Sequence, residues 1–153
     1  MFEVLCTTDL FMEKSMEIKV VLDEGAKLPT KAHESDAGFD LYSREDWNLF
    51  SGDAHSFDTG VHVAIPEGYV GFIKSKSGLN VREGIQAEGV IDSGYTGSIV
   101  VKMYNNGKAA HLFRKGDKLT QLVILPIPQV TLEQVDSLEE TERGDNGFGS
   151  SGK

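Results

Sequence analysis

Short runs of apolar and β-branched residues, separated by turn residues, repeat along most of the chain. The runs are EIKVVL (17–22), VHVAI (61–65), YVGFI (69–73), SIVVKMY (98–104), LTQLVIL (119–125) and TLEQV (131–135). In VHVAI the two valines and the isoleucine share one face while His62 and Ala64 take the other, which is the alternation of a half-buried strand. Many short strands with glycine-rich turns predict an all-β sandwich, jelly roll or barrel.

The pattern also divides the chain into three parts. One short helix is predicted in SGLNVREG, with Ser77 as its N-cap and Gly84 at its end. Residues 1–15 show no clear period and form an N-terminal extension, either a dispensable upstream start or an added strand. The β domain is expected over 16–138, and a flexible C-terminal arm rich in Gly, Ser and charge over 139–153.

Composition narrows the class of ligand and the compartment. The 153 residues suit one domain, and 15 Lys+Arg against 24 Asp+Glu give a formal net charge of -9, which argues against binding nucleic acid through a basic face. A small anion would need a local cluster of cations and backbone N–H groups. Cys6 is the only cysteine and no apolar run approaches the roughly 20 residues of a membrane span, so we expect a cytoplasmic protein without a membrane partner.

Two segments have the composition of a phosphate site. The tail RGDNGFGSSG (143–152) combines Arg143, Phe148 and serines flanked by glycines, so it can wrap an anion, although a Gly/Ser tail can equally be an idle linker. In SKSGLN (75–80), the charge of Lys76 coincides with free backbone N–H groups at the predicted helix start. A simple capped turn is the alternative for this second segment.

Carboxylates occur in three further segments. In GVIDSGYTG (89–97), Asp92 follows a predicted strand and could deprotonate a water, while Tyr95 could lie flat against a sugar or base; an ordinary β-turn is the alternative. In DAGFDLYS (36–43), Asp40 could hold Mg²⁺-bound waters. In GDKLTQLVI (116–124), Asp117 and Gln121 are four apart and are predicted to share one face of a strand.

Taken in order, DAGFDLYS, SKSGLN, GVIDSGYTG, GDKLTQLVI and RGDNGFGSSG resemble the five motifs of the homotrimeric dUTPases, some of which are phage-borne. Any one motif is weak, but five in order are specific. The resemblance implies a distorted jelly roll or β-barrel with one short helix and a flexible arm. It also implies a homotrimer with shared active sites, which uses Mg²⁺ to hydrolyse dUTP to dUMP and pyrophosphate by water attack on the α-phosphorus.

The resemblance assigns roles to individual residues. Asp92 matches the carboxylate that activates the water, Tyr95 the aromatic ring against the deoxyribose, and Phe148 the aromatic ring over the uracil. Asp40 matches the carboxylate that reaches Mg²⁺ through water. Main-chain selection of uracil falls on Gly89, Val90, Ile91 and Val100. Phosphate contacts fall on Lys76, Ser77, Gly78, Gln121, Arg143, Ser150 and Ser151, and Gly149 is a further substrate-binding residue.

One residue differs from the dUTPase motifs, and two other functions are possible for a chain with this pattern. Lys76 stands where the family usually has Arg, and a point charge does not reproduce a bidentate fork. The dCTP deaminases resemble the dUTPases in the Ser and Asp motifs, but the position of their glutamate base holds Lys102 here, and a cation cannot act as that base. A regulatory protein on the same scaffold, with a repressor-type partner, is the alternative from a different class. The four histidines lack metal-ligand spacing and are expected in surface or turn roles.

Overall fold

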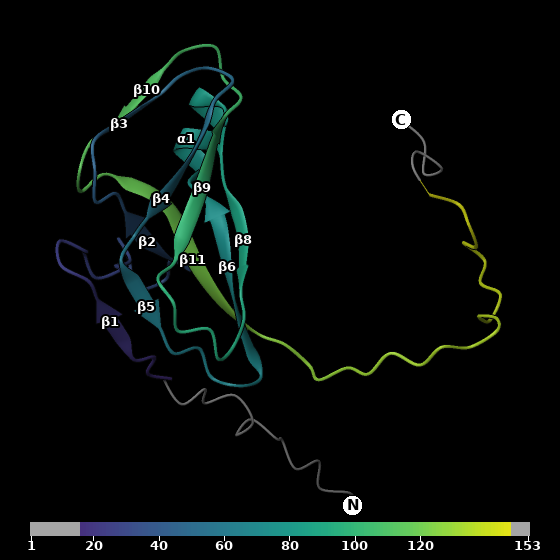
Figure 1. Cartoon of the computed structure of the whole chain (residues 1–153). Coiled ribbons are helices and arrows are strands. Elements are labelled where there is room, and N and C mark those ends of the chain that lie inside the picture. The colour runs from purple at the N-terminus through teal and green to yellow at the C-terminus, as the bar shows by residue number, and fades with distance from the viewer. Residues whose placement is uncertain (1–15, 148–153) are drawn as a thin grey trace, which may run out of the picture.

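The computed structural model describes residues 16–147, which form eleven strands and one short helix (Figure 1). The elements are β1 (Val20–Leu22), β2 (Gly38–Tyr42), β3 (Trp47–Leu49), β4 (Ala54–Asp58), β5 (Val61–Val63), β6 (Tyr69–Ser75), α1 (Ser77–Glu83), β7 (Ile85–Gln86), β8 (Glu88–Ile91), β9 (Val100–Asn105), β10 (His111–Phe113) and β11 (Lys118–Pro126).

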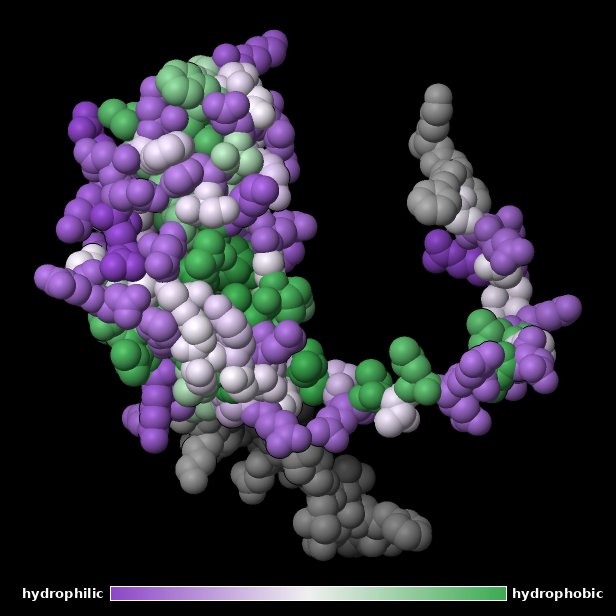
Figure 2. All heavy atoms as spheres, in the orientation of Figure 1, coloured by the Kyte–Doolittle hydropathy of each residue, from purple (hydrophilic) through white to green (hydrophobic). Residues whose placement is uncertain are grey.

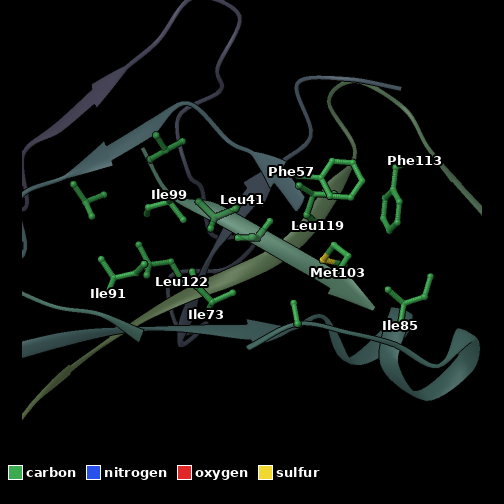
Figure 3. Packing of buried hydrophobic residues seen from close by; sticks show 14 of the residues in the cluster. Leu41, Phe57, Ile73, Ile85, Ile91, Ile99, Met103, Phe113, Leu119 and Leu122 are labelled. Atoms are coloured by element: carbon green, nitrogen blue, oxygen red, sulfur yellow. The ribbon is translucent and has the colours of Figure 1, made fainter. Parts of the chain in front are cut away.

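The strands pair antiparallel in four sheets. The largest has the order β2-β11-β6-β8, and a second has the order β4-β9-β7; β1 pairs with β5 and β3 with β10. One core of fully buried side chains, among them Leu41, Phe57, Ile73, Met103 and Leu119, lies between the sheets (Figure 3). The all-β jelly-roll class is therefore confirmed, whereas the described strands do not close into a barrel.

Most predicted strands are found, with bounds that are shorter, longer or shifted. In VHVAI, Val61, Val63 and Ile65 are buried as the alternation required. The run TLEQV (131–135) is not a strand, because no other described segment pairs with it. The strand prediction for these residues is wrong: β propensity alone does not supply the partner that a strand needs.

The short helix is also found, with one correction. Gly84 ends it in the left-handed conformation, with φ of 71°, as predicted. The N-cap is Lys76 rather than Ser77, because Lys76 has extended backbone angles while Ser77 already belongs to the helix, and no side chain caps it.

After β11, the chain leaves the folded body (Figure 1). Residues 127–147 contain no strand or helix, and their apolar side chains are exposed, Leu132 to 98% (Figure 2). The domain boundary at 138 stays a prediction, and the N-terminal extension 1–15 lies outside the described residues. The one helix within residues 16–147 is not long and apolar enough to cross a membrane.

Candidate active site

A buried carboxylate held by two lysines is the centre of the first cluster. Asp40 is the middle residue of β2, and it is only 2% exposed. Lys76 Nζ lies 2.5 Å from Asp40 Oδ1, and Lys118 Nζ lies 2.7 Å from Asp40 Oδ2. Because the lysine side chains keep 30% and 47% of their surface exposed, both ammonium groups sit between a buried anion and solvent. This arrangement fixes two positive charges where an anionic ligand can approach them.

The pKa values follow from these contacts. Burial alone would raise the pKa of Asp40, but the hydrogen bonds from Lys118 and Lys76, together with their charges, outweigh it and lower the pKa below its usual value. The hydrogen bond to Asp40 likewise raises the pKa of Lys118. Asp40 and Lys118 are therefore both charged at neutral pH.

Gln121 lies beside this cluster because β11 pairs with both β2 and β6. Its Cα partners are Asp40 on β2 and Lys74 on β6, and its Nε2 donates to the carbonyl of Ser75 at 3.2 Å. Its side chain lies over Gly38, where a Cβ atom would stand 2.5 Å from Gln121 Oε1. Glycine in the DAGFD segment thus leaves room for the glutamine.

The start of α1 adds backbone donors to the cluster. The first intrahelical hydrogen bond runs from Asn80 N to Lys76 O at 2.9 Å, so the N–H groups of Ser77 and Gly78 have no acceptor within the helix. Both residues are exposed, and Gly78 has open space around its Cα. The structure therefore places Lys76, Ser77, Gly78 and Gln121 close to Asp40.

The second cluster is the turn after β8. Tyr95 N donates to Asp92 O at 3.2 Å, and Gly94 takes a left-handed φ of 83° to close the turn. The Tyr95 hydroxyl donates to Ser98 O at 3.0 Å, and its ring lies across Gly97, where a Cβ atom would stand 2.5 Å from the hydroxyl oxygen. Asp92 and Tyr95 therefore lie on one exposed turn, with the hydroxyl end of the ring held close to Gly97 and Ser98.

The strand before this turn has an open edge. β8 is the last strand of its sheet, and no described strand pairs with its outer side. Its outward backbone N–H and C=O groups at 89–91 can therefore bind a ligand with a donor and acceptor pattern of its own. Val90 and Val100 are more than half exposed beside that edge.

The two clusters lie at opposite ends of the β6–β8 pair. Gly71 pairs with Ile91, while Lys74 pairs with Glu88. Asp92 is thus next to the start of β6, six positions before Lys76, which is roughly 20 Å along a strand. The described part of one chain does not bring Asp92 together with Lys76.

The arm is only partly described. Arg143 Nε donates to Asn146 O at 3.1 Å in a local turn and contacts neither cluster. The remaining predicted site residues, Phe148, Gly149, Ser150 and Ser151, lie outside the described residues.

Comparison with known proteins explains this set of residues. The family model named dUTPase matches residues 24–152. The chain belongs to the dUTPase family. The deoxyuridine 5'-triphosphate nucleotidohydrolase of Clostridium tetani is 41% identical over 144 residues, covering 92% of this chain and 99% of its own length. That of Mycobacterium tuberculosis is 44% identical over 142 residues, covering 87% and 92%.

Solved structures agree with the family. The dUTPase of Staphylococcus bacteriophage 80alpha with dUpNHpp is 33% identical, with a TM-score of 0.81 over 91% of this chain and all of that one. A mutant dUTPase from phage phi11 of S. aureus, whose structure details the coordination of a structural Mg(II) ion, is 32% identical with a TM-score of 0.75 over 82% of this chain. The jelly-roll architecture is thus that of other dUTPases.

A resident metal ion does not fit the described side chains. Within residues 16–147, no three His, Cys, Asp or Glu side chains gather closely enough to hold one. Both oxygens of Asp40, the residue expected to reach Mg²⁺ through water, already accept hydrogen bonds from ammonium groups. The described side chains of one chain therefore do not by themselves form a site for Mg²⁺.

The structure adds one site residue and removes another from its expected place. Lys118 was not predicted from the sequence. Its only local signal is that it is a cation two residues after a turn glycine in GDKLTQLVI. Asp117 does not share a strand face with Gln121. It precedes β11 and its Oδ2 accepts from Arg114 N at 2.8 Å, because the turn needs a side-chain acceptor there.

Proposed function

We propose that this chain is a dUTP diphosphatase, which hydrolyses dUTP to dUMP and pyrophosphate. The observation that carries the proposal is the pair of lysines fixed by buried Asp40 beside the free N–H groups of α1, a ready site for a triphosphate. It occurs in a chain of the dUTPase family that retains Asp92 and Tyr95.

Each residue then has a chemical task. Lys76, Ser77, Gly78 and Gln121 bind phosphate oxygens, and Arg143, Gly149, Ser150 and Ser151 add contacts from the arm. The backbone of Gly89, Val90, Ile91 and Val100 selects uracil, Tyr95 excludes a 2′-hydroxyl, and Phe148 covers the base. Asp92 takes a proton from the water that attacks in line at the α-phosphorus, and pyrophosphate is the leaving group.

The active site is shared between subunits of a homotrimer in this proposal. Asp92 and Lys76 lie at opposite ends of one strand pair, so a second chain has to bring one to the other. Exposed apolar side chains on residues 127–138, together with an apolar cavity of about 370 Å³ lined by residues that include Met16, Phe39 and Ile124, support assembly with further copies.

Magnesium enters this proposal as part of the substrate. Mg²⁺ takes its direct contacts from phosphates and keeps several waters, so the bound species is the Mg²⁺ complex of dUTP. The water-mediated contact with Asp40 stays a prediction. A cytoplasmic location belongs to the same proposal, since one cysteine among 153 residues suits a reducing compartment.

The test is a substrate panel of dUTP, dCTP, UTP and dTTP with Mg²⁺, followed by pyrophosphate release. We expect turnover of dUTP alone, and its loss in Asp92→Asn with dUTP binding retained. Ammonia release from dCTP would instead identify a deaminase, which the exposed Lys102 on β9 argues against. Unchanged turnover in Asp92→Asn would overturn the proposed mechanism.

A regulatory role is the second candidate, because several structural neighbours are phage proteins. Structures of the phage 80alpha dUTPase are described as phage dUTPases that control transfer of virulence genes by a G protein-like mechanism. A repressor-type protein partner for this chain would be a further property, compatible with the enzyme. Binding of a candidate repressor that dUpNHpp changes would support it.

A further inference from the structure

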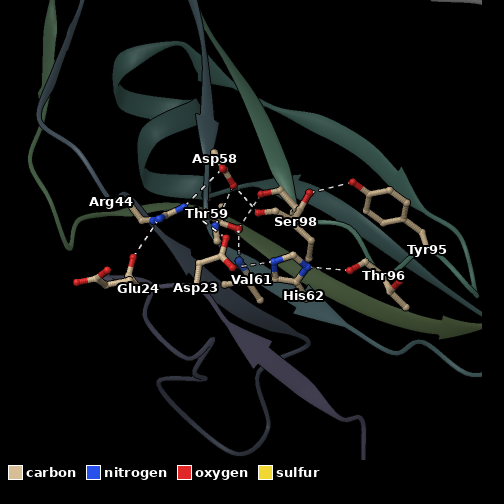
Figure 4. Close-up of polar contacts among 12 residues, drawn as sticks. Asp23, Glu24, Arg44, Asp58, Thr59, Val61, His62, Tyr95, Thr96 and Ser98 are labelled. Atoms are coloured by element: carbon tan, nitrogen blue, oxygen red, sulfur yellow. Dashed lines mark hydrogen bonds and ion pairs between the residues drawn. The ribbon is translucent and has the colours of Figure 1, made fainter.

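The turn that carries Asp92 and Tyr95 is tied to the body by side chains from β4 and β5 (Figure 4). His62 Nδ1 lies 2.7 Å from the carbonyl oxygen of Thr96, one residue after Tyr95. Ser98 Oγ donates to Asp58 Oδ1, and the Tyr95 hydroxyl donates to Ser98 O. The backbone of residue 99 then joins β5, with Ile99 N donating to Val61 O at 2.9 Å.

His62 makes a second contact on the other side of its ring. Its Nε2 lies 3.2 Å from Asp23 Oδ1. A carbonyl and a carboxylate both accept hydrogen bonds, and a neutral imidazole has only one N–H to donate. Both contacts are hydrogen bonds at once only when His62 is an imidazolium.

The charges around His62 favour that form. The hydrogen bond to Thr96 contributes most to raising the pKa of His62; burial opposes it, and the contact with Asp23 and the charges of Asp23 and Asp58 add to the increase. Two cations also lie nearby: Arg44, which pairs with Asp23 at 3.8 Å and with Asp58 at 3.5 Å, and Lys19, which lines the same hollow as His62. Arg44 neutralises part of the carboxylate charge, and its own place is fixed by Glu24 O at 3.0 Å.

We propose that His62 is a positioning residue, which holds the turn of Asp92 and Tyr95 in place through its two ring N–H groups. The inference rests on the proposed function, in which Asp92 activates water and Tyr95 selects the deoxyribose. When His62 loses its proton, one of the two hydrogen bonds is lost. His62 then no longer links the carbonyl of Thr96 to the carboxylate of Asp23. The turn then loosens at the residue next to Tyr95.

The pH dependence has a definite sign. A raised pKa in the folded protein means that the link is complete below the ordinary histidine value of about 6.5 and is lost as pH rises through the raised value. The turnover number should therefore fall with rising pH in the wild-type enzyme. In His62→Arg the charge and the donors persist, so this fall should disappear.

Three variants test the link: His62→Ala, His62→Arg and the control His111→Ala. His111 also faces a carboxylate, Glu83, but it lies on β10 away from the turn. We expect His62→Ala to lose roughly ten- to a hundredfold in kcat and to discriminate less between dUTP and UTP, because a small displacement of reacting groups costs that much. His111→Ala should keep both values. Thermal unfolding of each variant reports whether it is folded.

The kinetic result has a clear contrary outcome. If folded His62→Ala keeps wild-type kcat and selectivity, or if His62→Arg shows the same pH profile as the wild type, His62 does not position the turn.

A second measurement separates this inference from the proposed function. In NMR spectra, the ring signal of His62 and the amide signals of Tyr95 and Thr96 should titrate with one midpoint, and the amide titration should vanish in His62→Arg. Coupled titration in a protein that does not hydrolyse dUTP would retain the link and reject the proposed function. Amide signals that ignore the protonation of His62 would reject the link, whatever the enzyme does.

Discussion

Gly38 and Gln121 face each other diagonally across the β2–β11 pair, so closely that a Cβ atom at position 38 would stand 2.5 Å from Gln121 Oε1 and 2.8 Å from Gln121 Cβ. Position 38 thus has to be glycine for the Gln121 side chain to lie where it does. Gln121 in turn reaches the Ser75 carbonyl next to Lys76, which connects the packing of β2 to the phosphate site.

Gly38→Ala should displace Gln121 and damage the site more than the fold. Overpacking costs about 1–3 kcal/mol of unfolding free energy, which a domain of this size survives. The catalytic efficiency for dUTP should fall about as far as in Gln121→Ala, because the added methyl group acts through that side chain. Steady-state kinetics and urea unfolding of both variants check this, and wild-type kinetics in both variants would show that Gln121 has no role.

Asp40→Asn should destabilise the protein at neutral pH by roughly 2 kcal/mol, since two lysines would lose a buried charged partner. The folded pKa of Asp40 is lowered, so its contribution is present above the unfolded value of about 3.9 and is lost as pH falls through the lower folded value. The difference between wild type and variant should therefore shrink in acid.

Unfolding by urea at several pH values measures this difference. Glu88→Gln is the matched control, because Glu88 pairs with Lys74 on the surface, where both side chains are more than half exposed, and such pairs contribute about 0–1 kcal/mol. Equal stability of Asp40→Asn and wild type at neutral pH would mean that the lysine pair needs no anchor.

The features that the sequence predicted well are those set by neighbours along the chain. Gly84 ends α1 because it alone takes the left-handed angle there, and the alternation of Val61 and Val63 needs only a period of two. The five motifs could also be read locally, and the structure brings Lys76 and Gln121, from two of them, next to Asp40 from a third.

The features that were missed depend on pairing between distant segments. Lys118 meets Asp40 only because β11 pairs with β2, and His62 meets Thr96 only because the turn after β8 folds back on β5. TLEQV has the composition of a strand and fails for the same reason: no described segment pairs with it. A single sequence carries propensity at such positions but not the partner.

Removal of the residues after Glu142 should reduce turnover severely and leave the β domain folded. The last strand ends at Pro126, and the strand order and core do not involve the residues beyond it. We expect a wild-type thermal transition together with a kcat lowered by at least about a hundredfold, because in the proposed function the arm excludes water from the substrate and adds phosphate contacts. A truncated protein with normal kcat would remove the arm from the mechanism.

In the proposed trimer, mixing two variants tests whether Asp92 and Lys76 act from different chains. Their positions at opposite ends of the β6–β8 pair leave roughly 20 Å between them along the strand, too far for one substrate to span within one chain. Asp92→Asn and Lys76→Ala should each be nearly inactive alone. Refolded together in equal amounts, they should regain activity, because a site can take Asp92 from one variant and Lys76 from the other.

The size of the recovery follows from symmetry. In a random mixture, each site receives an intact Asp92 with a chance of one half and an intact Lys76 from a second chain with the same chance, so about a quarter of the wild-type activity is expected. If both residues came from the same chain, no intact site would form and the mixture would remain inactive. Mixing the two proteins without refolding supplies the control, since trimers that do not exchange subunits gain nothing.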